Sequence, residues 1–365
     1  MSKRVFNFSP GPAVLPVKVL EEAQRAVLEL PGVGMSILEI SHRSKAFEAV
    51  MAESQSLLRE LLGIPSNYKI IYLQGGSSLQ FSMLAMNLLR GTGRTAEYVL
   101  TGTWGTKAFA EAKREGNAHA AWDGKSHNYS YLPDAAELKF AADAAYVHIT
   151  SNETIQGVEF PAEPDTGSIP LVCDASSNFL SRPVDVSRYG LLYACAQKNA
   201  GISGVTAVII RDDLLAKVPT GLPPMLDYRL QAENDSLYNT PPVFAIYVLL
   251  LILRWLKDDI GGLAKMAKLN VEKANLLYDV LDKHKDFYKG HARGDSRSQM
   301  NVTWRLPSEE LETEFVKQAK ARDLVDLKGH RSVGGIRASI YNAMPKEGVT
   351  ALRDLMLEFQ KQHAK

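Results

Sequence analysis

The chain is poor in cysteine and carries almost no excess charge of either sign. Its 365 residues include two cysteines, Cys173 and Cys195, and both lie inside apolar runs. This placement favours inert core thiols over a disulfide framework or a metal site. The formal net charge is +1 and there is no basic block, so the chain lacks the electrostatic footprint of a nucleic-acid-binding protein. We therefore expect a small-molecule partner, no nucleic acid and no metal ion.

A long apolar run is also missing. The most membrane-like segment, Val243 to Leu253, falls well short of the ~20 apolar residues that a spanning helix needs. Thr240 and the two prolines after it predict an N-cap with proline in the first turn, and Gly261-Gly262 predicts the end of the segment. We expect a buried core or interface helix. The start of the chain is basic without a continuous apolar stretch, which argues against a secretory signal and favours the cytoplasm.

Strand-like and helix-like segments alternate through the middle of the chain, which predicts an α/β fold with a mostly parallel sheet flanked by helices. The predicted strands are Lys69 to Leu73, Glu97 to Thr101, His119 to Trp122, Ala145 to Thr150, Leu171 to Cys173, Leu191 to Ala196 and Val205 to Ile210. The predicted helices are Leu79 to Leu89 and Trp104 to Arg114.

From about Leu263 the pattern changes to long amphipathic helices with few strands. Alternation predicts strands at Asn301 to Arg305 and Gly335 to Ile340, and helical periodicity predicts Glu309 to Ala321 and Gly348 to Gln362. We expect an N-terminal arm over residues 1–15, a large α/β domain over residues 16–262 and a small α+β domain over residues 263–365.

Asp174 and Lys198 each close a short apolar run that is typical of a buried strand. In open α/β sheets, chemistry concentrates at the carboxyl ends of the strands. Pyridoxal phosphate needs a lysine to form a Schiff base and an acid to keep its ring nitrogen protonated. The pair is compatible with that cofactor, and also with a helix-capping aspartate and a solvated surface lysine.

A turn rich in small residues, Gln74-Gly75-Gly76-Ser77-Ser78, joins a predicted strand to a predicted helix. Unpaired N–H groups and hydroxyls at a helix N-terminus offer donors to a phosphate. The alternative is an ordinary tight turn with serine caps. Trp104 begins another predicted helix, where it could stack on a flat ring or fill the core. Thr154 follows a predicted strand, which would bring it to the same carboxyl-end edge of the sheet.

Cationic residues form the next group: His42-Arg43, His330-Arg331 and Arg337. Arginine binds carboxylate and phosphate through a planar fork, and histidine adds a donor near neutral pH. The alternative for each is a surface ion pair. Arg337 stands apart because it lies in an alternating strand between Ile336 and Ala338.

These and other short segments together resemble the phosphoserine aminotransferases, in order and over nearly the whole chain. The segments are Phe8-Ser9-Pro10-Gly11-Pro12-Ala13, Ser41-His42-Arg43-Ser44, Gln74-Gly75-Gly76-Ser77-Ser78, Gly102-Thr103-Trp104, Ser151-Asn152-Glu153-Thr154-Ile155-Gln156-Gly157, Asp174-Ala175-Ser176-Ser177, Gln197-Lys198-Asn199, Tyr238-Asn239-Thr240-Pro241-Pro242 and Gly334-Gly335-Ile336-Arg337-Ala338-Ser339. The resemblance implies a fold type I pyridoxal phosphate enzyme and a homodimer with shared active sites.

For the cofactor ring, the resemblance implies that Lys198 forms the Schiff base, that Asp174 holds the proton on the ring nitrogen, that Trp104 stacks on the ring and that Thr154 bonds near its phenolic oxygen. It also implies a set of residues that hold the cofactor phosphate, the last two arriving from the other subunit: Gly76, Ser77, Ser78, Gln197, Asn239 and Thr240. Some members of the family have Gly-Arg where this chain has Ser77-Ser78, which leaves the side-chain contacts to the phosphate open.

For the substrate, the resemblance implies that Arg337 binds the α-carboxylate. The other implied substrate-binding residues, which would take the distal phosphate or carboxylate or lie beside it, are Ser9, His42, Arg43, His330 and Arg331. The implied reaction is reversible transfer of the amino group between glutamate or 2-oxoglutarate and 3-phosphohydroxypyruvate or 3-phosphoserine. Phosphorylated hydroxythreonine precursors of vitamin B6 are further candidate substrates.

Other activities remain open at this stage. A related aminotransferase for serine, alanine or glyoxylate would need no cluster of distal cations. A cysteine desulfurase would need a mobile reactive cysteine. A sensor of phosphorylated ligands could use Gly76, Ser77 and the arginines without any chemistry at Lys198.

Overall fold

A seven-stranded sheet forms the centre of the computed structural model, which describes residues 4–363. The strand order is β2-β10-β9-β8-β5-β3-β4, and only β10 runs antiparallel to its neighbours. This confirms the mostly parallel sheet. The strands are β2 (Tyr68–Leu73), β3 (Thr95–Leu100), β4 (Asn117–Asp123), β5 (Tyr146–Thr150), β8 (Leu171–Asp174), β9 (Tyr189–Cys195) and β10 (Thr206–Arg211).

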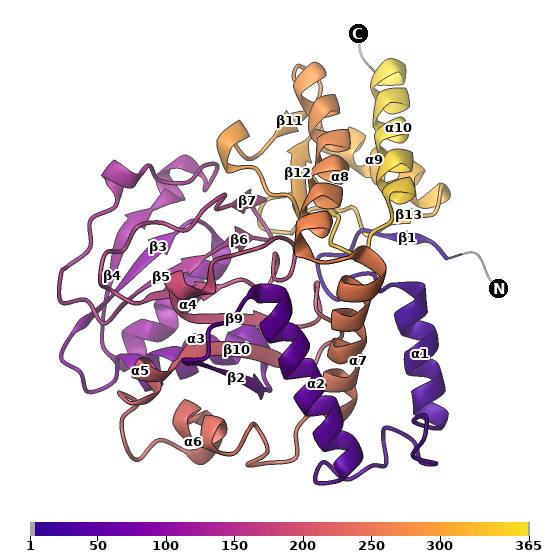
Figure 1. Ribbon diagram of the computed structural model, residues 1–365. Coiled ribbons are helices and arrows are strands. Elements are labelled where there is room, and N and C mark those ends of the chain that lie inside the picture. The colour runs from indigo at the N-terminus through magenta and orange to yellow at the C-terminus, as the bar shows by residue number, and fades with distance from the viewer. Residues whose placement is uncertain (1–3, 364–365) are drawn as a thin grey trace.

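Helices cover both faces of this sheet (Figure 1). Successive residues of a strand therefore enter different cores: Ile70 and Tyr72 join the first core, while Ile71 and Leu73 join the second. Burial on both faces explains why the strands are almost continuously apolar. The first core includes side chains of α1 (Val17–Leu28), α2 (Lys45–Leu62) and α7 (Val243–Arg254), and the second includes side chains of α3 (Gly76–Leu88), α4 (Thr103–Glu115), α5 (Asp212–Leu215) and α6 (Tyr228–Glu233).

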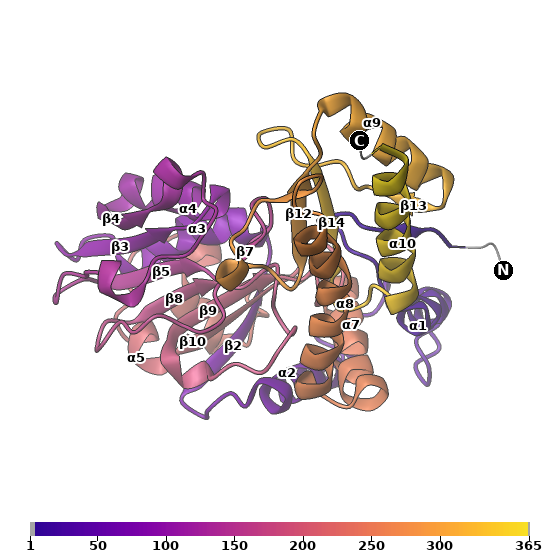
Figure 2. The same ribbon diagram turned by 90° about the horizontal axis from the view of Figure 1, so that it is seen from above.

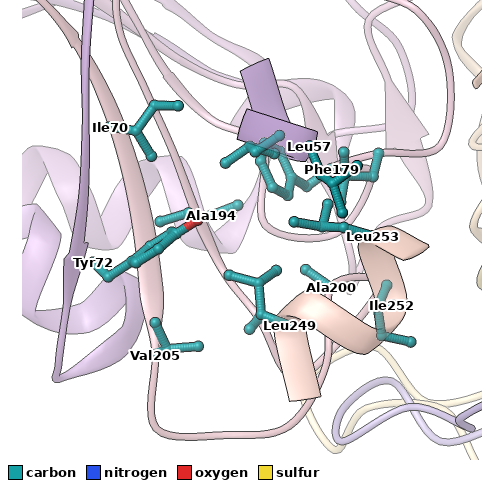
Figure 3. Close-up of a cluster of buried hydrophobic side chains, with 14 of the residues drawn as sticks. Leu57, Ile70, Tyr72, Phe179, Ala194, Ala200, Val205, Leu249, Ile252 and Leu253 are labelled. Carbon is teal, nitrogen blue, oxygen red and sulfur yellow. The ribbon is translucent and has the colours of Figure 1, made fainter. Parts of the chain in front are cut away.

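Helix α7 is the predicted apolar helix, and it is buried as expected. Figure 3 shows Leu249 and Leu253 of this helix in one buried cluster with Leu57 of α2 and Tyr72 of β2. Its chain continues as a π-helical segment, Trp255–Ile260, and ends at Gly261 in the left-handed conformation. The predicted cap at Thr240 is wrong, because α7 begins at Val243 with Pro242 in the N-cap position. A residue that precedes a proline is disfavoured in helical conformation, so the Pro241-Pro242 pair delays the start.

The C-terminal part of the chain builds a third core of its own. Its elements are α8 (Leu263–Lys283), β11 (Lys289–Gly290), β12 (Asn301–Arg305), α9 (Glu309–Ala321), β13 (Leu324–Val325), β14 (Ile336–Ser339) and α10 (Lys346–His363). Figures 1 and 2 show these elements gathered to one side of the large sheet. Helix α8 belongs to both parts, because Leu263 and Met266 lie in the first core and Leu277 and Leu281 in the third.

The N-terminal arm joins this C-terminal part. Strand β1 (Phe6–Asn7) pairs in parallel with β13, and the side chain of Phe8 is fully buried in the third core. Residues 1–3 of the predicted arm and residues 364–365 of the predicted small domain lie outside the described residues. The domain boundaries at 15/16 and 262/263 stay a prediction.

Most predicted segments are present with small differences at their ends. Helix α9 has the predicted bounds, and α10 begins two residues earlier than predicted. Strand β14 starts at Ile336 because Gly335 has a φ of 72°, which a strand does not allow. Two short strands, β6 (Asn152–Glu153) and β7 (Val158–Glu159), form a separate pair. Among residues 4–363, no helix has the length and apolarity to cross a membrane.

Candidate active site

A cavity of about 340 Å³ opens at the carboxyl ends of the parallel strands. Chain segments that follow β2, β3, β5, β8 and β9 meet there, as expected for an α/β sheet. The predicted site residues that line it are Gly76, Ser77, Ser78, Trp104, Thr154, Asp174, Gln197, Lys198, His330 and Arg337. The fold therefore brings together most of the residues that the sequence singled out.

Lys198 lies in a turn, three residues beyond the end of β9 at Cys195. The prediction that the strand continues to Lys198 is wrong, because the amide of Ala200 bonds back to the carbonyl of Ala196 and closes a turn. The Lys198 Nζ donates a hydrogen bond of 2.7 Å to Thr154 Oγ1 and lies 5.8 Å from the centroid of the Trp104 ring. The amine thus points into the cavity beside an aromatic face.

The N-terminal arm packs against this turn. The amide of Ala13 donates to the carbonyl of Gln197 at 2.8 Å. A Cβ added at Gly11 would lie 3.5 Å from Lys198 Cγ, and Gly11 has a φ of 146°. The arm therefore holds the stem of Lys198 from the side opposite the sheet.

Asp174 ends β8 and is 4% exposed. Its Oδ1 accepts hydrogen bonds from the amide and the hydroxyl of Ser176, while Oδ2 has no partner among residues 4–363. Burial raises the pKa of Asp174, and the bonds from Ser176 and the charge of Lys198 oppose that rise. A carboxylate oxygen without a protein partner, on the wall of a cavity, suits a protonated ring nitrogen.

The start of α3 lies at the other end of the cavity. Within residues 4–363 nothing accepts from the amides of Gly76, Ser77 and Ser78, so the helix N-terminus offers free donors. Gly75 has a φ of 86°, and a Cβ there would lie 2.5 Å from Leu79 Cδ2, so the turn requires glycine. The Ser77 hydroxyl lies 2.6 Å from that of Ser176, which links the phosphate end of the cavity to Asp174.

The donors and the acceptor of this cavity fit pyridoxal phosphate. Free amides at a helix N-terminus match its phosphate, the unpartnered Asp174 Oδ2 matches its ring nitrogen, and the Lys198 amine matches its aldehyde. Trp104, whose ring faces the Lys198 amine, is placed to cover the ring. Within residues 4–363, no cluster of His, Cys, Asp and Glu could hold a metal ion.

Arg337 comes from β14 and closes the cavity from the C-terminal part of the chain. It is 7% exposed, its Nη1 donates to the Thr154 carbonyl at 3.4 Å, and its Nε has no partner among the described residues. Burial lowers the pKa of Arg337, although arginine stays protonated in proteins. His330 lines the cavity beside it, and its pKa is lowered by burial and then by the charges of Arg337 and Arg331.

Other predicted residues do not line the cavity of this chain. Arg43 is exposed, and its Nε contacts His42 Nε2 at 3.4 Å in the loop before α2. Asn239 and Thr240 are exposed before α7, where the Thr240 carbonyl accepts from Gln74 Nε2. Ser9 and Arg331 lie next to cavity residues, Pro10 and His330, without lining it themselves.

Glu153 is a site residue that the sequence analysis missed. It is fully buried, and its carboxylate accepts the amides of Trp104 at 3.0 Å and Gly105 at 2.8 Å, at the start of α4. Burial raises its pKa to about 7, against the lowering effect of those two amides, while Asp174 raises it and Lys198 lowers it. The sequence signal was its place three residues after the end of β5, beside Thr154.

Asn152 and Ser176 were also missed. The Asn152 Nδ2 donates to Ser177 Oγ and to Asn301 Oδ1, both at 2.8 Å, and so connects the cavity floor with β12. Ser176 bonds to Asp174 and to Ser77. Both residues follow predicted strands and belong to segments that resemble the family. Their roles were missed because their hydrogen-bond partners come from distant parts of the chain.

Fold and cavity together define a pyridoxal phosphate-dependent aminotransferase of fold type I. The family model named Aminotransferase class-V matches residues 5–352. The phosphoserine aminotransferase of Rhodopirellula baltica is 54% identical over 363 residues, which cover 99% of this chain and 96% of the relative.

Solved structures give the same result. A phosphoserine aminotransferase from Bacillus circulans subsp. alkalophilus superimposes with a TM-score of 0.97 at 51% identity, covering 100% of both chains. The structure of a pyridoxal phosphate-bound phosphoserine aminotransferase from Trichomonas vaginalis has a TM-score of 0.92 at 40% identity, covering 97% of this chain and 100% of that one. The chain belongs to the class-V aminotransferases and, within them, to the phosphoserine aminotransferase family.

Proposed function

We propose that this chain reversibly transfers an amino group between glutamate or 2-oxoglutarate and 3-phosphohydroxypyruvate or 3-phosphoserine, as a step of serine biosynthesis. Family membership over the full length supports this reaction. The observation that supports it most directly is the placement of the Lys198 amine and the Asp174 carboxylate in one cavity of about 340 Å³. We propose the phosphorylated hydroxythreonine precursors of vitamin B6 as further substrates of the same site.

Pyridoxal phosphate supplies an aldehyde that bonds to amines and a ring that accepts electrons. In our proposal Lys198 would hold the cofactor through that aldehyde. Once the substrate amine replaced it there, the freed Lys198 amine would accept the proton that leaves the substrate Cα and deliver it to the carbon that the aldehyde supplies. Thr154 accepts a hydrogen bond from the Lys198 amine at 2.7 Å and so keeps the amine at the cavity edge. Asp174 holds a proton on the ring nitrogen, which its burial and unpartnered oxygen suit.

The remaining cavity residues position the reactants. The amides of Gly76, Ser77 and Ser78 hold the cofactor phosphate, and Gln197 lies beside it. The Ser77 hydroxyl bonds to the Ser176 hydroxyl, which donates to Asp174. We therefore expect the phosphate to be bound mostly by the backbone amides. Trp104 covers the ring and excludes water.

Arg337 would bind the substrate α-carboxylate, since its unpartnered Nε leaves part of its planar fork free. His330 and Arg331 would bind the distal phosphate, and Ser9 directly precedes the cavity residue Pro10. A cysteine desulfurase is not favoured, because both cysteines are buried on strands of the sheet. Their buried free thiols also suit the cytoplasm, which we propose as the location.

We also propose that the chain acts as a homodimer with shared sites. Several apolar side chains at the end of α1 and in the loop that follows are exposed, among them Leu28 at 81%, Leu38 at 59% and Met35 at 48%. Exposed apolar groups of this size suit an interface. His42, Arg43, Asn239 and Thr240 lie outside their own cavity, so they could serve the proposed function only at the site of a partner subunit.

Replacement of the proposed cofactor-binding amine tests the reaction. The variant Lys198→Ala should lose transamination between glutamate and 3-phosphohydroxypyruvate and the visible absorbance of the bound cofactor. Reduction of the wild-type protein with borohydride should add the mass of the cofactor to the peptide that contains Lys198. The exposed Lys125→Ala variant serves as the matched control and should behave as the wild type. Turnover by Lys198→Ala, or labelling of another lysine, would refute the proposal.

A further inference from the structure

A buried lysine without an acidic partner lies behind the active site. Lys273 of α8 is 3% exposed, and among residues 4–363 no carboxylate pairs with it. Its Nζ instead donates to four backbone carbonyls, those of Ile340 at 3.0 Å, Tyr341 at 2.8 Å, Asn342 at 3.3 Å and Met344 at 3.2 Å. A lysine that is fully buried without a counter-charge is rare and needs a reason.

The four carbonyls favour the charged form of this amine. Burial lowers the pKa of Lys273 to about 7. A neutral amine has two N–H groups for four acceptors, whereas an ammonium has three and carries the charge that carbonyl dipoles attract. Four carbonyl oxygens around one centre at 2.8–3.3 Å are also the kind of shell that replaces water around a potassium ion.

The carbonyls belong to one short segment, residues 340–344, which follows β14 and its Arg337. From this segment, the amide of Asn342 donates to Asn199 Oδ1 at 3.0 Å, and Asn199 is the neighbour of Lys198. The hydroxyl of Tyr341 donates to the carbonyl of Pro10 at 2.7 Å. The segment therefore contacts both the turn that carries Lys198 and the arm that packs against it.

Without a central cation this arrangement is unfavourable. The carbonyls of one turn converge on a buried point, where they repel one another and have no access to water. The segment would relax to separate them, and the bonds from Asn342 and Tyr341 would shift with it. The Lys273 ammonium fixes the segment in the conformation that reaches Asn199.

We propose that Lys273 is a positioning residue that acts as a built-in monovalent cation: its ammonium gathers the carbonyls of residues 340–344 and so sets the Lys198 turn. Removal of the side chain then leaves a carbonyl cage that a potassium or ammonium ion can fill. The effect on turnover rests on the proposed transamination, whereas ion binding by the variant does not.

The test is chemical rescue of Lys273→Ala. In buffer that contains only tetramethylammonium as the cation, kcat of this variant should fall at least about tenfold, because a small displacement of the reactive amine is costly. The KM for glutamate should change less, since Arg337 stays in place. Potassium or ammonium chloride at equal ionic strength should restore most of the loss. The wild type and Lys268→Ala, an exposed lysine on the same helix, should show no such response.

A second readout does not involve activity. The melting temperature of cofactor-free Lys273→Ala should rise with potassium or ammonium and not with tetramethylammonium. Lys273→Met fills the same space without charge, so it should be impaired and should not respond to ions. If the alanine variant fails to fold, full activity of Lys273→Met would overturn the positioning role, and its rescue by potassium would overturn the cation cage. Full activity of Lys273→Ala without small cations would overturn the positioning role.

Loss of activity and of stability that no cation reverses would overturn the cation cage. If the melting temperature responds to potassium while the wild type does not transaminate, the proposed function is wrong and the cage stands.

Discussion

Glu153 and Lys273 carry ionisable groups that the fold removes from water. Burial brings the pKa of both side chains to about 7, from above in the lysine and from below in the glutamate. The glutamate binds two backbone amides, and the lysine binds four carbonyls. Glu153 therefore connects its segment to the start of α4, and Lys273 connects α8 to residues 340–344.

The raised pKa of Glu153 predicts a pH dependence of stability. The unfolded chain releases this proton near pH 4.5 and the folded chain near pH 7, so between these values the folded state binds more protons. The free energy of unfolding should therefore fall as the pH rises through this window, on the order of 3 kcal/mol from this residue. Buried His148, with a pKa lowered to about 3, contributes in the opposite direction up to its ordinary value.

Comparison with Glu153→Gln isolates the contribution of the carboxyl group. Urea unfolding of the cofactor-free wild type and of this variant at several values between pH 5 and pH 8 should give curves of different slope, the wild type losing more stability with rising pH. Parallel curves would show that Glu153 does not titrate in this range.

Among single residues, the sequence alone predicted the site residues whose side chains act through their own chemistry. Lys198, Asp174 and Arg337 stand out because a reactive group follows or interrupts an apolar strand. Glu153 and Lys273 did not, because what distinguishes them is burial against the backbone of a distant segment. Helical periodicity places Lys273 on the buried face of α8 with Met266 and Val280, unlike the exposed Lys265 and Lys268. Its carbonyl partners lie 67 to 71 residues further along the chain, and no local pattern reveals them.

At the scale of single elements, the strand-to-helix turn before α3 depends on two glycines with positive φ. Gly75 also lacks room for a side chain, since a Cβ would lie 2.5 Å from Leu79 Cδ2. Gly93, in the loop before β3, has a φ of 68° but nothing within 4 Å of an added Cβ. Both positions therefore require a left-handed backbone, but only Gly75 would place a side chain against Leu79.

The pair Gly75→Ala and Gly93→Ala therefore separates the two effects. Both variants should lose about 1 kcal/mol of stability from the left-handed conformation. Gly75→Ala should lose roughly 1–3 kcal/mol more from the clash, and should bind pyridoxal phosphate more weakly because the α3 amides move. Equal losses in urea unfolding and equal cofactor affinity, measured by absorbance titration, would contradict this explanation.

Local patterns predicted most strands of the large sheet and several helices, because burial on both faces leaves a continuous apolar run and burial on one face leaves a clear periodicity. The differences lie where the backbone, rather than the apolar pattern, decides. Pro241 and Pro242 keep the residues before them out of helical conformation, so α7 begins at Val243 and not after the predicted cap at Thr240. The run that ends at Ala196 contains no signal for the turn that places Lys198, since the turn depends on the pairing of β9 with β10.

In the whole molecule, the cavity of one chain lacks several residues that the family resemblance assigns to the site. His42, Arg43, Asn239 and Thr240 come from loops outside this cavity, and under our homodimer proposal a second copy of the chain brings them to it. The mostly parallel sheet was predictable from the alternation of elements. The strand order and the distance of these loops from the cavity were not, because both depend on contacts between segments far apart in sequence.

Mixing of two impaired variants tests the shared site. Lys198→Ala and Arg43→Ala should each have little activity toward phosphorylated substrates. When they are unfolded together and refolded, mixed dimers should contain one site with both residues intact, so activity should return to about one quarter of the wild type by random pairing. Refolding each variant alone is the control. Absence of recovery, or a monomer in light scattering, would refute shared sites.

The pairing of β1 with β13 has a consequence for how the protein is made. Phe6 and Asn7 are synthesised 318 residues before their partners Leu324 and Val325. The arm that carries Pro10 and Gly11 past Lys198 cannot settle until then. We therefore expect a nascent chain to complete its large sheet before the arm packs against Lys198, and to bind vitamin B6 tightly only after residues 324–325 have been made.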